Sequence, residues 1–157
     1  MSLESVRAFF AANAPDIAIL EASTSTATVA LAAAAHGVAP GQIAKTLSLQ
    51  VGDATVLVVT RGDAKLDNKK LKQAFGGKPK FVDLAQVEAL TGHPVGGVCP
   101  FGLATPLPVY CDVSLQAFDV VIPAAGDVHT ALRIEPARMA SLTRAQWIDV
   151  SILPEPV

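Results

Sequence analysis

Hydrophobic positions along the chain switch between helical and strand-like spacing. Near the start, Leu3, Val6, Phe9 and Phe10 recur at the spacing of one helical face, and Pro15 follows where that helix should have ended. Two later stretches, 43–51 and 55–60, are rich in β-branched and aliphatic residues and are separated by Gly52-Asp53. That separation is typical of a β-hairpin turn, so we expect the two stretches to pair as antiparallel strands.

The remaining elements are short and are separated by turn and capping signals. Three further helices are each expected to begin after a hydroxyl or acidic residue and to end before a glycine. We expect helices over 27–35, 68–74 and 84–90 and from Pro136 onward, and strands over 17–20, 80–82, 107–111, 120–122, 131–134 and 147–152. About seven strands and five helices, with hairpin signals rather than regular βαβ alternation, predict an α+β fold. We expect one domain over 1–157, with a mixed, mostly antiparallel sheet flanked by short helices.

Composition narrows the class of protein. With 157 residues, of which 51% are hydrophobic and 17% charged, the chain has the size and apolar content of one folded domain. No apolar run reaches the roughly 18 residues of a membrane span, and the N-terminus lacks the pattern of a signal peptide. We therefore expect a cytoplasmic protein with reduced thiols at Cys99 and Cys111. Two cysteines and three scattered histidines do not suggest a zinc site, and we expect no metal and no cofactor.

Basic residues concentrate in one segment although the net charge is −2. Between positions 61 and 80 the chain has seven basic residues against two acidic ones: Arg61, Lys65, Lys69, Lys70, Lys72, Lys78 and Lys80 against Asp63 and Asp67. Such a run is usually a solvated helix face. It also suits a phosphate-backbone contact of limited extent, whereas non-specific coating of nucleic acid is not indicated.

Lys45 is the first candidate for chemistry. It alternates with the apolar residues Ile43, Leu47 and Leu49 in the strand predicted over 43–51. An ammonium group on such a face is either buried against a negative group or reaches the rim of the sheet along its aliphatic stem. The pattern leaves both interpretations open.

Two irregular stretches are further candidates. The glycine-rich stretch 92–102 could present amide hydrogens to a carbonyl or oxyanion, or could be a tight bend. His129, in the turn 124–130, is either a base or substrate contact, or simply a solvated histidine. Cys99 could be a nucleophile, but no histidine is placed beside it by the spacing, and a lone cysteine is more often a small hydrophobe.

Three motifs in order resemble one family. They are Ile43-Ala44-Lys45-Thr46-Leu47, the run from Lys65 to Leu71, and the stretch Val95-Gly96-Gly97-Val98-Cys99-Pro100-Phe101-Gly102. From about residue 17 to about 150 the chain resembles the YbaK/prolyl-tRNA-synthetase-associated domain family. The resemblance implies an α+β fold around an antiparallel sheet. It also implies a hydrolase that cleaves the ester between a wrong amino acid and the terminal ribose of tRNA, most often tRNA(Pro).

The resemblance also assigns residues. Lys45 matches the family's signature lysine and is the expected catalytic residue, and 96–100 matches its Gly-x-x-x-Pro loop. The expected substrate-binding residues are Thr46, Gly96, Gly97, Val98, Cys99, Pro100, Gly126 and His129, although His129 matches no family hallmark. The expected tRNA-backbone contacts are Lys65, Lys69, Lys70 and Lys72. The family's mechanism implies that the substrate's own ribose hydroxyl helps to activate water.

The leading hypothesis is therefore a monomeric trans-editing deacylase acting on mischarged tRNA, most often tRNA(Pro) carrying Cys, Ala, Ser or Thr. Prolyl-tRNA synthetase is the expected protein partner, and no membrane is involved. One alternative is a catalytically silent tRNA-binding module of the same fold. Another is a hydrolase of small amides or esters that depends on Cys99, which predicts inactivation by alkylation.

Overall fold

A long β-hairpin forms the centre of the fold. The computed structural model describes residues 2–153, and in it strand β2 (Ile43–Val51) runs antiparallel to β3 (Ala54–Arg61) along their whole length. Gly52 makes the turn with a φ of +60°, a left-handed conformation that glycine adopts without steric cost. The predicted hairpin is confirmed, and β2 has the predicted bounds.

The hairpin is extended into a six-stranded mixed sheet. β5 (Lys80–Phe81) pairs antiparallel with β2, whereas β7 (Ile122–Pro123) pairs parallel with it. On the other side, β6 (Val109–Asp112) runs parallel to β3, and β9 (Gln146–Ile148) runs parallel to β6. Two antiparallel pairs lie apart from this sheet: β1 (Ile19–Glu21) with β8 (Thr130–Leu132), and β4 (Lys65–Leu66) with β10 (Ser151–Ile152).

The predicted α+β class and mixed sheet are confirmed. Four of the seven strand pairings among the described residues are antiparallel, and the longest one, β2 with β3, is among them. The predicted count of about seven strands was too low, since the described residues form ten. The strand expected over 147–152 is divided between β9 and β10, and β4 carried too few residues to show any alternation.

The described residues form five short α-helices around the sheet. They are α1 (Ser2–Asn13), α2 (Val29–His36), α3 (Asn68–Phe75), α4 (Leu84–Thr91) and α5 (Pro136–Thr143), with 3₁₀ turns η1 (Pro40–Gln42) and η2 (Val113–Ala117). The side chains of Thr28, Asp67 and Asp83 accept the first free N–H groups of α2, α3 and α4. Left-handed glycines end the same three helices. None of these helices is long and apolar enough to cross a bilayer.

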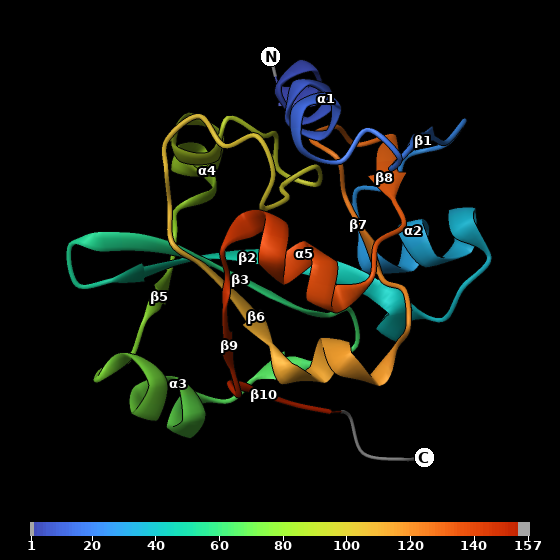
Figure 1. Cartoon of the computed structure of the whole chain (residues 1–157). Coiled ribbons are helices and arrows are strands. Elements are labelled where there is room, and N and C mark those ends of the chain that lie inside the picture. The colour runs from blue at the N-terminus through green and yellow to red at the C-terminus, as the bar shows by residue number, and fades with distance from the viewer. Residues whose placement is uncertain (1, 154–157) are drawn as a thin grey trace.

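The central strand β3 is buried on both faces. Leu57 and Val59 pack with α1, α5 and Phe101 on one face, and Val56 and Val58 pack with Leu71 of α3 on the other. Figure 1 shows α5 in front of the sheet, with α1 above it and α3 below. Burial on both sides explains why the β3 sequence is a continuous apolar run rather than an alternating one.

The outer edge of β2 is covered only at its two ends. β7 covers Ile43 and Ala44, and β5 covers Leu49 and Gln50. Helix α2 packs through Ala32 and Ala33 against the β7 end. Between the two covered ends, the stretch 45–47 faces an open gap, and this gap holds an apolar cavity.

Candidate functional site

A largely apolar cavity of about 350 Å³ opens at the gap along β2. Five chain segments line it, and its lining residues are Thr26, Ala27, Thr28, Val29, Ala32, Ile43, Ala44, Lys45, Thr46, Leu47, Ser48, Phe81, Val82, Leu84, Val87, Val95, Gly96, Val98, Ile122, Ala124, Thr130 and Ala131. Of these described residues, Lys45 alone has a titratable side chain. Within residues 2–153, no three His, Cys, Asp or Glu side chains are grouped so that they could hold a metal ion.

Lys45 is a half-buried cation, held by one hydrogen bond among the described residues. Its Nζ donates to the main-chain carbonyl of Ala64 at 2.6 Å. In the part of the chain that the structure describes, no carboxylate lies within ion-pairing distance of Nζ. Burial lowers the pKa of Lys45, and the charge of Asp63 partly opposes that shift. An ammonium group has three N–H donors, so two remain for a ligand.

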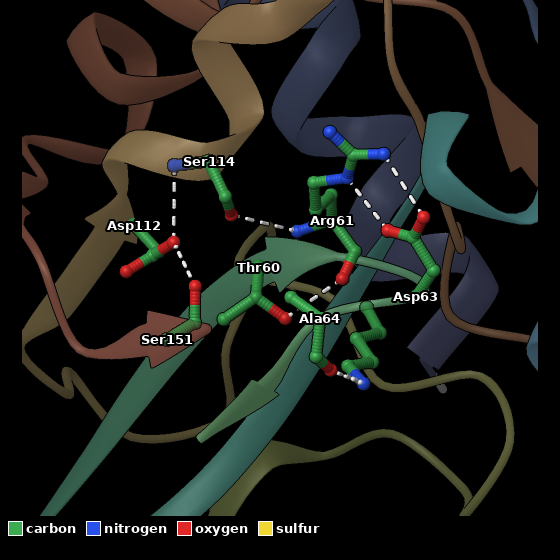
Figure 2. A network of polar contacts seen from close by, with 8 residues as sticks. Thr60, Arg61, Asp63, Ala64, Asp112, Ser114 and Ser151 are labelled. Atoms are coloured by element: carbon green, nitrogen blue, oxygen red, sulfur yellow. Dashed lines mark hydrogen bonds and ion pairs between the residues drawn. The ribbon is translucent and has the colours of Figure 1, made fainter. Parts of the chain in front are cut away.

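A braced turn holds the carbonyl that anchors Lys45. Arg61 and Asp63 form a two-pronged ion pair at 2.6 and 2.9 Å, and the main-chain N–H of Arg61 donates to the hydroxyl of Ser114 at 3.4 Å. Figure 2 shows this pair beside Ala64. A Cβ at Gly62 would lie 2.2 Å from the carbonyl oxygen of Pro40, so the turn requires glycine there. The turn is therefore tightly constrained. Because it carries the carbonyl of Ala64, it also constrains the position of the Lys45 ammonium group.

Thr46 offers unpaired polar groups to the cavity. Its Oγ1 is buried without a hydrogen-bond partner among the described residues. The carbonyl of Ser48 points across the open edge, where it accepts from the N–H of Val82 at 3.0 Å. Because main-chain groups of alternate strand residues point to the same edge, those of Thr46 face the gap as well. Thr46 can therefore bind a polar ligand atom through its side chain or main chain.

The glycine-rich loop reaches the cavity through three of its residues, Val95, Gly96 and Val98. Gly96 has a φ of +91°, and a Cβ there would lie 2.8 Å from the Cβ of Ala27. Gly97 is committed to the fold: its N–H donates to Pro94 at 2.9 Å, and its carbonyl accepts from Gly126 at 3.0 Å. The N–H groups of Gly96 and Val98 have no acceptor among the hydrogen bonds of the described residues. The loop thus leaves two amide donors free, one on either side of Gly97.

Five predicted substrate-binding residues lie outside the cavity lining, namely Gly97, described above, and four others. Cys99 is fully buried in the core, and burial raises the pKa of its thiol to about 12. The expectation that no histidine lies beside it was wrong, since Nε2 of the buried His93 is 3.6 Å from its Sγ. Pro100, within the same loop, is also buried. At Gly126 a Cβ would lie 2.8 Å from the carbonyl oxygen of Ser2, so this glycine allows α1 to approach. His129 is exposed, with Nδ1 3.1 Å from the carbonyl oxygen of Thr24. These residues belong to the structure around the site, and none of them lines the cavity.

The four predicted tRNA-contacting lysines divide into two groups. Lys65, Lys69 and Lys72 are exposed, on β4 and α3, and form no ion pair among the described residues. Lys70 instead donates to Asp149 at 2.9 Å and to the carbonyl of Ser151 at 2.8 Å, which ties α3 to the chain near β10. The first group is therefore available to a ligand, whereas Lys70 is committed to the fold.

The sequence interpretation missed much of the apolar lining. Thr26, Ala27 and Val29 reach the cavity from the start of α2, and Phe81 and Leu84 reach it from β5 and α4. Thr26 had been interpreted only as a capping hydroxyl, and Ala27 and Val29 only as residues of the helix predicted over 27–35. A two-residue strand such as β5 is too short for alternation to show which side chain is exposed.

Together, fold and site define a small α+β protein whose apolar cavity contains a single half-buried cation among the described residues. A family model described as "Aminoacyl-tRNA editing domain" matches residues 23–142. A Bacillus subtilis protein named YwhH, uncharacterised by its own description, is 45% identical over 96% of this chain and 97% of its own. EbsC of Enterococcus faecalis, named as a candidate Cys-tRNA(Pro)/Cys-tRNA(Cys) deacylase, is 34% identical over 73% of this chain and 71% of its own.

A solved structure shows the same fold. It is described as a candidate trans-editing enzyme for prolyl tRNA synthetase and has a TM-score of 0.89 and 32% identity, covering 96% of this chain and 97% of that one. The chain belongs to the aminoacyl-tRNA editing domain family, and the resemblance seen in its motifs is confirmed.

Proposed function

We propose that this protein hydrolyses the ester bond of mischarged tRNA, with tRNA(Pro) carrying Cys, Ala, Ser or Thr as its substrate. One observation carries the proposal: the ammonium group of Lys45 and the free amides of Gly96 and Val98 border a single cavity. The names of EbsC and of the trans-editing structure support the same class of substrate.

Lys45 serves as the electrostatic anchor of the site. Two of its N–H donors are free, and they suit the terminal phosphate or the ribose oxygens of a bound aminoacyl-adenosine. Because the ammonium group lies in a largely apolar cavity, its attraction for developing negative charge is stronger than it would be in water.

The amide donors of the loop serve the reacting carbonyl. As ester hydrolysis proceeds, negative charge develops on the carbonyl oxygen, and N–H groups aimed at that oxygen stabilise it. Gly96 and Val98 are the proposed donors, whereas the N–H of Gly97 is already used by Pro94. Among the described residues no carboxylate, imidazole or thiol lines the cavity. As the family resemblance implies, we propose that the substrate's own ribose hydroxyl helps to activate the water.

The apolar wall of the cavity sorts the amino acids. Val29, Ile43 and Ile122 belong to this wall, and Thr130 adds a hydroxyl to it. A pocket of this kind distinguishes side chains by roughly 1–3 kcal/mol per methylene group, which favours small side chains that fit without displacing the wall. We propose that the exposed Lys65, Lys69 and Lys72 contact the tRNA backbone, and that prolyl-tRNA synthetase delivers the substrate.

The decisive experiment is a deacylation panel. Purified protein is mixed with tRNA(Pro) charged separately with Pro, Cys, Ala, Ser and Thr, and loss of the ester is followed over time. We expect at least one wrong amino acid to be released while Pro-tRNA(Pro) is spared. Lys45→Ala should lower the rate by about 10²–10³-fold, the range seen when one stabilising donor of an oxyanion is removed.

Two controls separate the alternatives. Lys45→Arg keeps a positive charge at the site and should retain more activity than Lys45→Ala. A tRNA whose terminal adenosine lacks the free ribose hydroxyl should be bound but not deacylated. Tight binding with no turnover of any acyl group would overturn the proposal in favour of a silent tRNA-binding module, and full activity of Lys45→Ala would refute the role of Lys45.

A further inference from the structure

The mouth of the cavity has an exposed apolar rim. Phe81, Leu84 and Val95 are 67%, 68% and 51% exposed, and all three line the cavity. They come from three different elements, namely β5, the first turn of α4 and the glycine-rich loop. Large apolar side chains that gather at the rim of a cavity mark a surface that a ligand covers.

The aromatic ring of Phe81 belongs to the same face of the sheet as Lys45. Phe81 pairs with Leu49 across the β5–β2 ladder, and directly opposed residues project to the same face. Lys45 precedes Leu49 by four positions, so its side chain also projects to that face. Counted along β2, the strand rise separates the two positions by about 13 Å, a span of the order of one nucleoside phosphate.

The charges around the ring favour an anionic ligand. Lys80, adjacent to Phe81, and Lys78 are exposed and form no ion pair among the described residues. The nearby carboxylate of Asp83 is engaged as the cap of α4, where it accepts from the N–H of Ala85 at 3.3 Å. Because neighbouring strand residues project to opposite faces, Lys80 does not lie against the ring, but its charge is close enough to attract the phosphate of a ligand stacked there. Proteins combine such attraction with base stacking on an exposed aromatic ring.

We propose that Phe81 is a stacking platform for the terminal adenine of tRNA, with Leu84 and Val95 enclosing the edges of the base. This inference rests on the proposed function and adds to it a base-binding subsite outside the acyl pocket. Stacking would place the ribose between Phe81 and Lys45, so that the ester reaches the amides of Gly96 and Val98.

The kinetic test compares Phe81→Ala with Phe81→Trp. Loss of one base–aromatic stack should raise KM for mischarged tRNA roughly 5- to 150-fold with little change in kcat, because the ring binds the base and not the reacting ester. Phe81→Trp preserves a stacking surface and should keep KM near that of the wild type. Val113→Ala, an exposed apolar residue on η2 away from the cavity, is the matched control and should leave KM unchanged. An unchanged KM in Phe81→Ala would overturn the inference.

A binding test needs no catalysis. The chain has one tryptophan, Trp147, so Phe81→Trp in a Trp147→Phe background places a single fluorophore at the rim. AMP should quench it, whereas ribose 5-phosphate, which lacks the base, should not. Equal responses to both ligands, or none to either, would refute base stacking.

The two proposals fail in distinguishable ways. If no mischarged tRNA is deacylated but AMP selectively quenches the fluorescence of the Phe81→Trp variant, the proposed function fails and the base subsite stands. If deacylation proceeds with an unchanged KM in Phe81→Ala, only the subsite fails. The rim could instead be covered by a second copy of this chain, and sedimentation tests this. If the wild type is a dimer that Phe81→Ala converts to a monomer, the rim serves self-association and the inference is overturned.

Discussion

Gly96→Ala tests whether close packing of the glycine-rich loop shapes the cavity. The new Cβ would lie 2.8 Å from the Cβ of Ala27 and within 3.3 Å of its carbonyl oxygen, and the backbone there has a φ of +91°. Two costs therefore combine. A left-handed conformation costs a residue with a Cβ roughly 1–2 kcal/mol, and overpacking costs roughly 1–3 kcal/mol.

The expected loss in the free energy of unfolding is thus about 2–5 kcal/mol. For a domain of this length, this corresponds to a fall in Tm of roughly 4–20 °C. Gly52→Ala is the matched control, because Gly52 also has a positive φ, +60°, but a Cβ added there would meet nothing within 4 Å. It should cost only the conformational part, roughly 1–2 kcal/mol.

Thermal and chemical unfolding of both variants measures these values. A double variant, Gly96→Ala with Ala27→Gly, removes the nearest clashing atom and should recover at least about 1 kcal/mol through coupling between the two sites. Deacylation by Gly96→Ala should also fall, because the loop must move to relieve the clash, while Gly52→Ala keeps its activity. Equal destabilisation by Gly96→Ala and Gly52→Ala, with no coupling to Ala27, would refute the reasoning.

Three further predictions concern buried groups. Asp112→Ala leaves three donors without their acceptor, including the hydroxyl of Ser151 at 2.6 Å. It should lower the free energy of unfolding by about 3–5 kcal/mol, against about 1 kcal/mol for Ser151→Ala. Equal losses for the two variants in urea titrations would show that the network contributes nothing. Because burial raises the pKa of the Cys99 thiol to about 12, native protein at about pH 8 should resist alkylation there, and mass spectrometry should detect the adduct only after unfolding. Burial lowers the pKa of Lys45, and the charge of Asp63 opposes that shift, so Asp63→Asn should lower this pKa further. The ammonium group would then lose its proton at a lower pH, and deacylation should decline at a lower pH than in the wild type. Identical pH–rate profiles would contradict a role for the ammonium group.

Local chemistry made much of the secondary structure predictable. The caps Asp67 and Asp83, and the glycines that follow their helices, act within one turn of the chain, so their effect is visible in the sequence itself. The β2–β3 hairpin was equally clear because a two-residue turn forces neighbouring runs to pair.

The cavity was only partly predictable. The motif resemblance pointed to Lys45, Thr46, Gly96 and Val98, and the structure brings all four to one cavity. Their neighbours at the site were not visible, because the lining joins segments from positions 26 to 131 that meet only after the sheet has formed.

What the sequence determined by itself is therefore local: where helices begin and end, where the hairpin turns, and which residue types are available for chemistry. The tertiary structure decided which groups are free to act. Hydrogen bonds to distant residues commit the carbonyl of Gly97 and the ammonium group of Lys70, and burial makes Cys99 inaccessible. Within the part of the chain that the structure describes, Lys45 keeps two donors free. The physical reason is that availability depends on burial and on partners far along the chain, and neither is a property of a residue's immediate neighbours in sequence.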